Sequence, residues 1–179
     1  IGGLERVAFP VERTAPVEAL HDVAQHVGDV RVVAAPADPF RAHSCHHPRS
    51  AWREALAELP GNVVLDVGRL RAGTPVGHLV QLADELLLVT SAEVSAVVAT
   101  DDWVASGGRV AASEPGMAEG ECRIVVVDAP GGVTFPKPTL QADLGHRAAG
   151  WLPWEPTTVD ALHRGVTFAD RRLRRSRFA

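Results

Sequence analysis

The stretch Asn62-Val63-Val64-Leu65-Asp66-Val67-Gly68-Arg69 decides the expected fold. It lacks the polar alternation of a half-buried strand, so it predicts a fully buried strand that ends in an acid, a spacer and a glycine. A second apolar stretch, Ala83-Asp84-Glu85-Leu86-Leu87-Leu88-Val89-Thr90, follows it. Such strands, separated by helices, predict an α/β fold with a mostly parallel sheet and helices on both faces.

The rest of the chain is expected to alternate between strands and helices. Further strands are predicted at 30–35, 109–112, 123–128 and 146–152, and helices at 16–27, 48–59, 74–82, 92–106, 136–144, 158–164 and 168–177. Residues 37–48 are polar and rich in breakers, which predicts a loop. No linker or repeat interrupts this order. The sequence therefore predicts a single α/β domain over 1–179, with a basic C-terminal helix or tail at 165–179.

Composition limits the class of protein. The chain has 179 residues, of which 46% are hydrophobic and 22% charged, which is typical of one globular domain. No apolar run is long enough to span a bilayer, and nothing resembles a signal peptide. The two cysteines, Cys45 and Cys122, predict free thiols in the reducing cytoplasm. The net charge of −4 argues against a protein that coats nucleic acid with its whole surface.

Asp66 and Gly68 are the first candidates for a functional site. A carboxylate at the end of a strand can hold the water shell of Mg²⁺, and a glycine two residues later can offer its backbone N–H to a terminal phosphate. The alternative is an acid that caps the next loop and a glycine that permits a turn. Because ligands of open α/β sheets bind at the carboxyl edge, Asp66, Thr90 and Asp128 are expected to cluster there.

Four segments carry a family resemblance. They are VRVVAAP at 30–36, VVLDVGR at 63–69, LADELLLVT at 82–90 with the helix after it, and GWLPWEP at 150–156. In this order they resemble the ParA/MinD branch of P-loop ATPases, of the SIMIBI type, and in particular its degenerate chromosome-partitioning-like members. The resemblance implies a P-loop NTPase-like sheet and a dimeric ATPase that positions or partitions DNA, a septum component or a secretion or pilus apparatus.

The resemblance also assigns roles to single residues. Asp66 matches the acid near Mg²⁺, and Gly68 matches the switch glycine near the terminal phosphate, so these two are the catalytic candidates. Pro153 matches the proline that lies near the adenine of ATP. Asp128 stands where many members have an asparagine that reads the base, and Glu155 replaces the usual aspartate.

The phosphate-binding loop of this family is missing from the sequence. No segment matches G-x-x-x-x-G-K-[ST]. Family members carry this loop before the region seen here, so the resemblance implies a sheet that is incomplete at its N-terminal end. ATP and Mg²⁺ are then expected only for a more complete protein, because nothing else would cradle and neutralise the phosphates. An unpaired sheet edge also predicts self-association.

Two further segments suggest other partners. The chain ends in a cluster of arginines, which are Arg171, Arg172, Arg174, Arg175 and Arg177. They predict contact with DNA phosphates or with an anionic membrane, with a solvated terminal helix as the alternative. The segment 43–47 contains three histidines and one cysteine that could ligate Zn²⁺ or Cu²⁺, although its spacing matches no closed structural site.

Three functional hypotheses therefore remain open. The first is the ParA/MinD-like ATPase, in which this chain alone does not hydrolyse ATP. The second is a non-catalytic pseudo-ATPase scaffold that retained the fold and lost the nucleotide. The third and weakest is a metal-binding module built on 43–47.

Overall fold

The computed structural model describes residues 3–10, 15–70, 76–106, 122–128 and 134–165. The described residues up to Leu82 form one compact unit, and those from Ala83 onward form a second. The prediction of a single domain over 1–179 stays a prediction, because a compact unit is not by itself an independently folding one. The expected strand at 109–112 and the expected helix at 168–177 lie outside the described residues.

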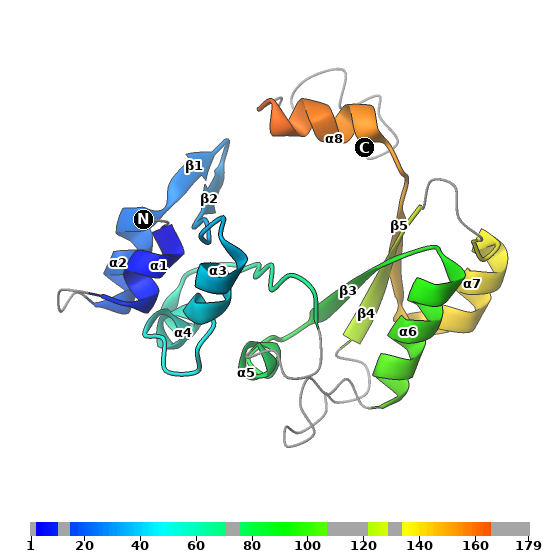
Figure 1. Cartoon of the computed structure of the whole chain (residues 1–179), viewed down its shortest axis with the longest axis horizontal. Coiled ribbons are helices and arrows are strands. Elements are labelled where there is room, and N and C mark those ends of the chain that lie inside the picture. Colours follow the sequence, from blue (N-terminus) through cyan, green and yellow to red (C-terminus); the bar gives the residue numbers. More distant parts are fainter. Residues whose placement is uncertain (1–2, 11–14, 71–75, 107–121, 129–133, 166–179) are drawn as a thin grey trace. The chain divides into compact units, whose positions relative to one another are not determined.

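The first unit is mainly helical (Figure 1). Its elements are α1 (Gly3–Ala8), α2 (Pro16–Val23), α3 (Pro39–Cys45), α4 (Trp52–Ala55), the 3-10 turn η1 (Leu56–Glu58) and α5 (Gly77–Val80). Their apolar faces share one core, formed by Val7, Ala8, Leu20, Cys45, Trp52, Ala55 and Leu79. Burial of each large apolar side chain in such a core stabilises the fold by about 1.5–3 kcal/mol.

The strand expected at 30–35 is present only as β2 (Val30–Val32), and its expected place in a parallel sheet is wrong. The chain instead forms an antiparallel hairpin of β1 (Gln25–Val27) and β2 (Val30–Val32). Gly28 adopts a φ of +60° in the two-residue turn, a conformation that glycine tolerates without strain, so the chain reverses there. The expected helix at 16–27 consequently ends at Val23.

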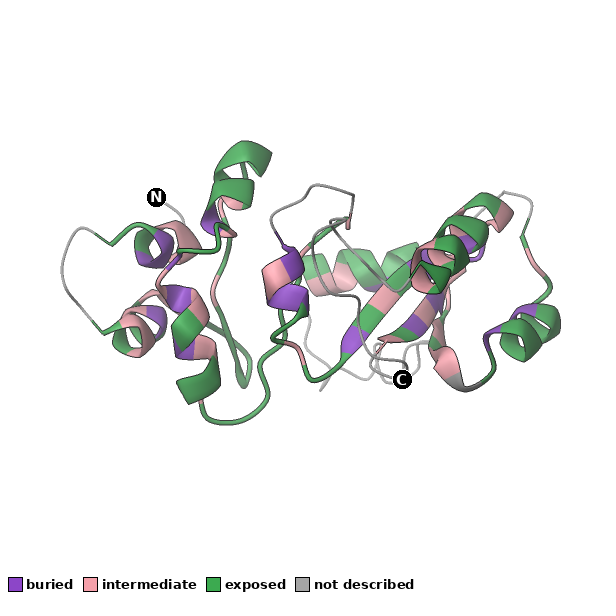
Figure 2. Cartoon of the chain, turned by 90° about the horizontal axis from the view of Figure 1, so that it is seen from below, coloured by how far each residue is buried: buried purple, intermediate pink, exposed green. Residues whose placement is uncertain are grey.

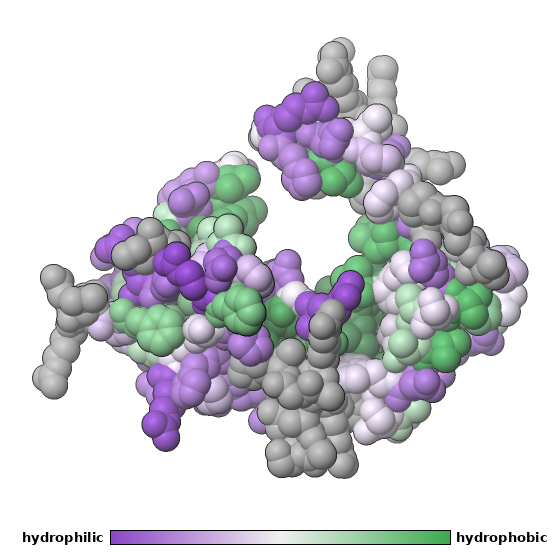
Figure 3. All heavy atoms as spheres, in the orientation of Figure 1, coloured by the Kyte–Doolittle hydropathy of each residue, from purple (hydrophilic) through white to green (hydrophobic). Residues whose placement is uncertain are grey.

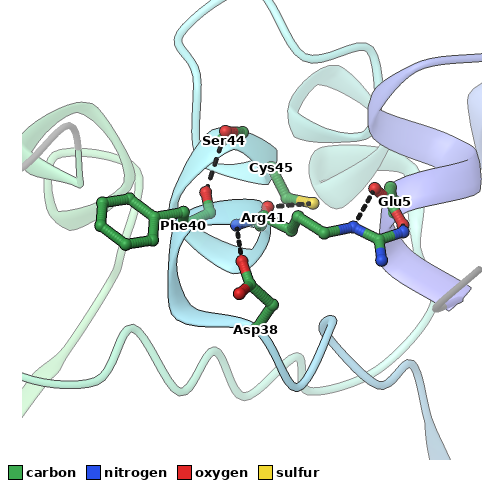
Figure 4. Close-up of polar contacts among 6 residues, drawn as sticks. All are labelled: Glu5, Asp38, Phe40, Arg41, Ser44 and Cys45. Carbon is green, nitrogen blue, oxygen red and sulfur yellow. Dashed lines mark hydrogen bonds and ion pairs between the residues drawn. The ribbon is translucent and has the colours of Figure 1, made fainter.

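The expected loop at 37–48 is also wrong, because it contains α3. The Asp38 carboxylate accepts a hydrogen bond from the backbone N–H of Arg41 at 2.8 Å and so caps this helix. The Arg41 guanidinium forms a bidentate ion pair with Glu5 of α1, in which Nε lies 2.9 Å from Oε1 (Figure 4). The histidine-rich segment is therefore helical up to Cys45.

The stretch that suggested the fold is not a sheet strand in this structure. Residues 62–68 have no regular secondary structure, and no described residue pairs with their backbone. Val64 is 91% exposed. A strand forms where a neighbour completes its hydrogen bonds, and in the first unit β1 and β2 pair with each other alone among the described strands.

The second unit contains a three-stranded parallel sheet, which confirms an α/β fold. Its strands are β3 (Leu86–Ser91), β4 (Cys122–Val127) and β5 (Ala148–Leu152), in the order β3-β4-β5. Along the chain α6 (Val94–Ala105) lies between β3 and β4, and α7 (Lys137–Leu144) and η2 (Gly145–Arg147) lie between β4 and β5. A last helix, α8 (Pro156–His163), follows β5.

Both α6 and α7 pack on the same face of this sheet (Figure 1). The strand order follows the chain order, so right-handed crossovers step in one direction and place both helices on one side. The core beneath them consists of Ala92, Val97, Ile124, Val126, Leu140 and Leu144. Buried and exposed residues alternate along β3 (Figure 2), and on the opposite face Leu87 is 52% and Val89 67% exposed. In the described residues these helices cover one face, where the sequence predicted cover on both.

Candidate functional site

Asp66 and Gly68 lie in the first unit and are bonded to each other. Oδ1 of Asp66 accepts a hydrogen bond from the backbone N–H of Gly68 at 2.9 Å. Gly68 has a φ of +68°, and a Cβ built there would meet nothing within 4 Å. This is an Asx turn, in which the acid caps the loop and the glycine supplies the left-handed backbone.

The expected site for Mg²⁺ and a terminal phosphate stays a prediction, and the structure gives the polar groups of Asp66 and Gly68 another partner. The N–H of Gly68 that was expected to face a phosphate donates to Asp66 instead, and both residues are exposed. Phosphate sites combine several converging backbone N–H groups with cationic side chains. Among the described residues, no group of three or more His, Cys, Asp or Glu side chains is placed to hold a metal ion.

Asp128 and Pro153 lie side by side at the carboxyl edge of the sheet in the second unit. Asp128 follows β4 and Pro153 follows β5, and the N–H of Asp128 donates to the carbonyl of Leu152 at 2.9 Å. The indole N–H of Trp151 donates to Oδ1 of Asp128. Nζ of Lys137 lies 5.0 Å from the centre of the Trp151 ring, where the ring quadrupole attracts a cation. We call Asp128, Trp151 and Lys137 the edge cluster.

The edge cluster holds its own members in place and offers little to a nucleotide base. An asparagine can both donate to and accept from a base, whereas the carboxylate of Asp128 only accepts, and Trp151 occupies one of its oxygens. Ligands of open α/β sheets bind where the strand order reverses, and the order β3-β4-β5 contains no reversal. The arrangement therefore gives Asp128 a structural task, which is to orient Trp151.

A pocket of about 250 Å³ lies beside Trp151, between α7 and β5. It is lined by Val126, Leu140, Gln141, Leu144, Ala148, Ala149, Gly150 and Trp151. The lining contains one amide and no cation, whereas a triphosphate requires cations or converging N–H groups. It is also smaller than most small-molecule sites. We interpret it as a packing gap beside the edge strand.

Within the histidine segment, Cys45 belongs to the core of the first unit and His46 is partly buried, whereas His43 and His47 are exposed. Cys45 is completely buried, and burial raises the pKa of its thiol, which donates to the carbonyl of Arg41 at 3.2 Å (Figure 4). The His46 ring packs edge-on against Trp52 with 6.3 Å between centroids, and its buried Nδ1 has no hydrogen-bond partner among the described residues. Burial, and secondly the charge of His43, lowers the pKa of His46. Cys45 and His46 are therefore engaged in packing.

The arginine cluster, Arg171, Arg172, Arg174, Arg175 and Arg177, lies outside the described residues. Its expected contacts with DNA or an anionic membrane therefore stay predictions. In the part of the chain that the structure describes, every helix is too short or too polar to cross a membrane.

No protein-family model, no curated protein and no solved structure matches this chain. The resemblance to ParA/MinD ATPases therefore depends on the sequence segments alone. Sequence reasoning missed the edge cluster, although one signal was available, since Lys137 is the only lysine of the chain. It also missed the Asp38 cap, whose Asp-Pro pair is a typical helix start.

Proposed function

We propose that this chain is a non-catalytic interaction domain of the ParA/MinD-like, P-loop NTPase-like type. The observation that carries the proposal is the Asx turn at Asp66, which uses the Gly68 N–H that a phosphate sensor would need. In this proposal the chain retains the sheet as a rigid scaffold and acts by binding a protein, a second copy of itself first of all.

Three features support the loss of nucleotide chemistry. The sequence of these 179 residues contains no Gly-rich phosphate loop. The carboxylate at the base-reading position, Asp128, is bonded to Trp151. The pocket nearest to it lacks a cation. The apolar residues exposed on the sheet face opposite α6 and α7 favour protein binding, since exposed apolar patches mark interaction sites.

The second candidate function is ATP-dependent positioning or partitioning of a cargo in the cytoplasm. The order and spacing of the four family-like segments favour it. It requires a phosphate loop from outside these residues, and in it Asp66, Gly68, Asp128 and Pro153 keep the roles that the resemblance assigns to them. The C-terminal arginines would then contact DNA or an anionic membrane.

Thermal unfolding of the complete protein, with and without Mg·ATP, separates the two functions, because the ATPase needs a phosphate loop from outside these residues. At a hundred times its Kd, Mg·ATP would stabilise the fold by about 2.7 kcal/mol and raise Tm by roughly 5–10 °C. We expect no such rise for the complete protein. Asp66→Ala is the test variant, and Asp84→Ala, another exposed acid, is the matched control. A rise in Tm that Asp66→Ala abolishes and Asp84→Ala preserves would refute the non-catalytic proposal and support the ATPase.

A further inference from the structure

We propose that the free edge of β3 pairs antiparallel with β3 of a second copy of this chain. The inference deepens the proposed function and rests on it, since it names the surface by which the domain self-associates. It requires no nucleotide, and its test is independent of the Mg·ATP experiment.

The two edges of the sheet differ in how well they resist pairing. At β5 the register shifts between Ile124 and Val125, so Ala149 is left without an opposite residue, and Pro153 follows the strand directly. Bulges and prolines are the usual protection of an edge strand. β3 pairs with β4 without interruption over six residues, and within Leu86–Ser91 it has no charge, proline or glycine. Among the described strands of this sheet, β3 is thus the edge open to another chain.

The backbone of β3 has hydrogen-bonding groups left over for this purpose. The N–H of Ala92 donates to the carbonyl of Val127 at 2.8 Å, so the backbone of Ala92 faces β4. Backbone groups of successive strand residues point to opposite sides, so Thr90 and Leu88 also face β4. The backbone groups of Leu87, Val89 and Ser91 therefore point away from β4. The Ser91 carbonyl accepts a hydrogen bond from the Thr90 hydroxyl at 3.5 Å, and among the described residues no backbone group of another strand is paired with Leu87, Val89 or Ser91 on that side.

One register pairs the free backbone groups of β3 without placing like charges opposite each other. With Leu88 at the two-fold axis, Leu87 of one copy lies opposite Val89 of the other, and the two form a hydrogen-bonded pair. Glu85 then lies opposite Ser91. Centring the axis on Val89 would instead place Glu85 opposite Glu93, and like charges directly opposite are destabilising. We therefore assign the axis to Leu88.

The side chains on this edge are also self-complementary. Leu87 and Val89 are 52% and 67% exposed on the face that α6 and α7 leave open. Apolar side chains gather over the strands of the second unit in the space-filling view (Figure 3). An antiparallel pair about a two-fold axis perpendicular to the sheet keeps equivalent faces on the same side. The dimer then joins two three-stranded sheets into one and places the apolar residues of both copies next to each other.

Sedimentation equilibrium of the full chain without nucleotide tests the association. We expect a mass that rises with concentration from 19.0 kDa towards twice that value. The variant Leu87→Lys/Val89→Lys places like charges opposite each other twice, and it should weaken the dimer at least about tenfold. Both sites are already exposed, so circular dichroism should stay unchanged. Val98→Lys is the matched control, because Val98 is 48% exposed on α6, and it should leave the dimer intact.

Cysteine cross-linking tests the register, in a Cys122→Ser background because that native thiol is partly exposed. Hydrogen-bonded antiparallel pairs have Cα atoms about 5.5 Å apart, which suits a disulfide. A mixture of Leu87→Cys and Val89→Cys chains should therefore form a mixed disulfide faster than either variant forms one with itself. Equal rates in all three samples would overturn the assigned register.

Two results would overturn the pairing itself. The first is a chain that stays monomeric at all concentrations. If the amides of β3 are protected from hydrogen exchange in that monomer, another segment of the chain covers the edge. The second is a dimer that is insensitive to Leu87→Lys/Val89→Lys or equally sensitive to Val98→Lys. Neither result bears on the proposed function, which would instead be refuted by a rise in Tm with Mg·ATP that depends on Asp66.

Discussion

The carbonyl of Cys45 offers a quantitative test of how the core of the first unit is held together. It lies at the end of α3 and accepts two side-chain hydrogen bonds, from the Ser50 hydroxyl at 3.0 Å and from the Trp52 indole N–H at 2.9 Å. Cys45, Ser50 and Trp52 are all buried. The two donors share one acceptor, so removing both should cost more than the sum of the single removals.

The expected magnitudes follow from the two bonds and the packing. Ser50→Ala should lower the free energy of unfolding by about 0.5–1.5 kcal/mol, because the carbonyl keeps the indole donor. Trp52→Phe should cost about 1–3 kcal/mol, since ring volume is lost together with the bond. The double variant leaves a buried carbonyl with no donor, which adds about 1–2 kcal/mol of coupling.

The assay is urea unfolding by far-ultraviolet circular dichroism, with hydrogen exchange at Cys45 and its neighbours to follow the first unit alone. Two compact units need not unfold in one transition, so this second probe is required. Ser44→Ala is the control, because the exposed Ser44 hydroxyl donates to the Phe40 carbonyl at 2.9 Å on the same helix (Figure 4). It should cost little and add to Trp52→Phe without coupling. Additivity of Ser50→Ala and Trp52→Phe within about 0.5 kcal/mol would refute the reasoning.

Two further predictions concern acid and backbone conformation. Burial lowers the pKa of His46, so the unfolded chain binds more protons than the folded chain once the pH approaches about 6.5. The contribution of His46 to stability should therefore be fully present above that pH. It should be lost as the pH drops through the lowered pKa. Tm measured from neutral to mildly acidic pH should show this loss of stability, and His46→Phe should make Tm less dependent on pH. If His47→Phe, at an exposed histidine, reduced the pH dependence equally, His46 would not be its cause. Gly68→Ala should cost about 1 kcal/mol through its φ of +68° alone, because no atom lies within 4 Å of the new Cβ. Gly150→Ala, which has equal space and no positive φ, should not lower Tm, and equal losses for both variants would disprove the backbone explanation.

Much of the second unit could be predicted from the sequence. The strands β3, β4 and β5 and the helices α6 and α7 lie within a few residues of their expected positions. Their apolar runs are continuous and bounded by capping or breaking residues, and such local patterns need no knowledge of distant neighbours. For the same reason the sequence correctly indicated that these strands are parallel.

The first unit shows where local patterns stop being sufficient. The run Val63-Val64-Leu65 has the composition of a buried strand, yet it is exposed, and no described residue pairs with its backbone. A strand needs such a neighbour to complete its hydrogen bonds. The β-branched residues at 30–33 formed half of a hairpin because a glycine turn precedes them. Composition predicted a strand in both places, and only the presence of a partner strand decided that one formed at 30–32 and none at 63–65.

The candidate site divides in the same way. The sequence by itself determined which residue types stand at the strand ends, Asp66 and Gly68 after one apolar run and Asp128 and Pro153 after others. Only the tertiary structure decided what their polar groups bind, with the indole N–H of Trp151 on Asp128 and the N–H of Gly68 on Asp66. A polar group binds whichever partner folding brings within about 3 Å, and for Asp128 that partner lies on another strand, where no local pattern of the sequence reaches.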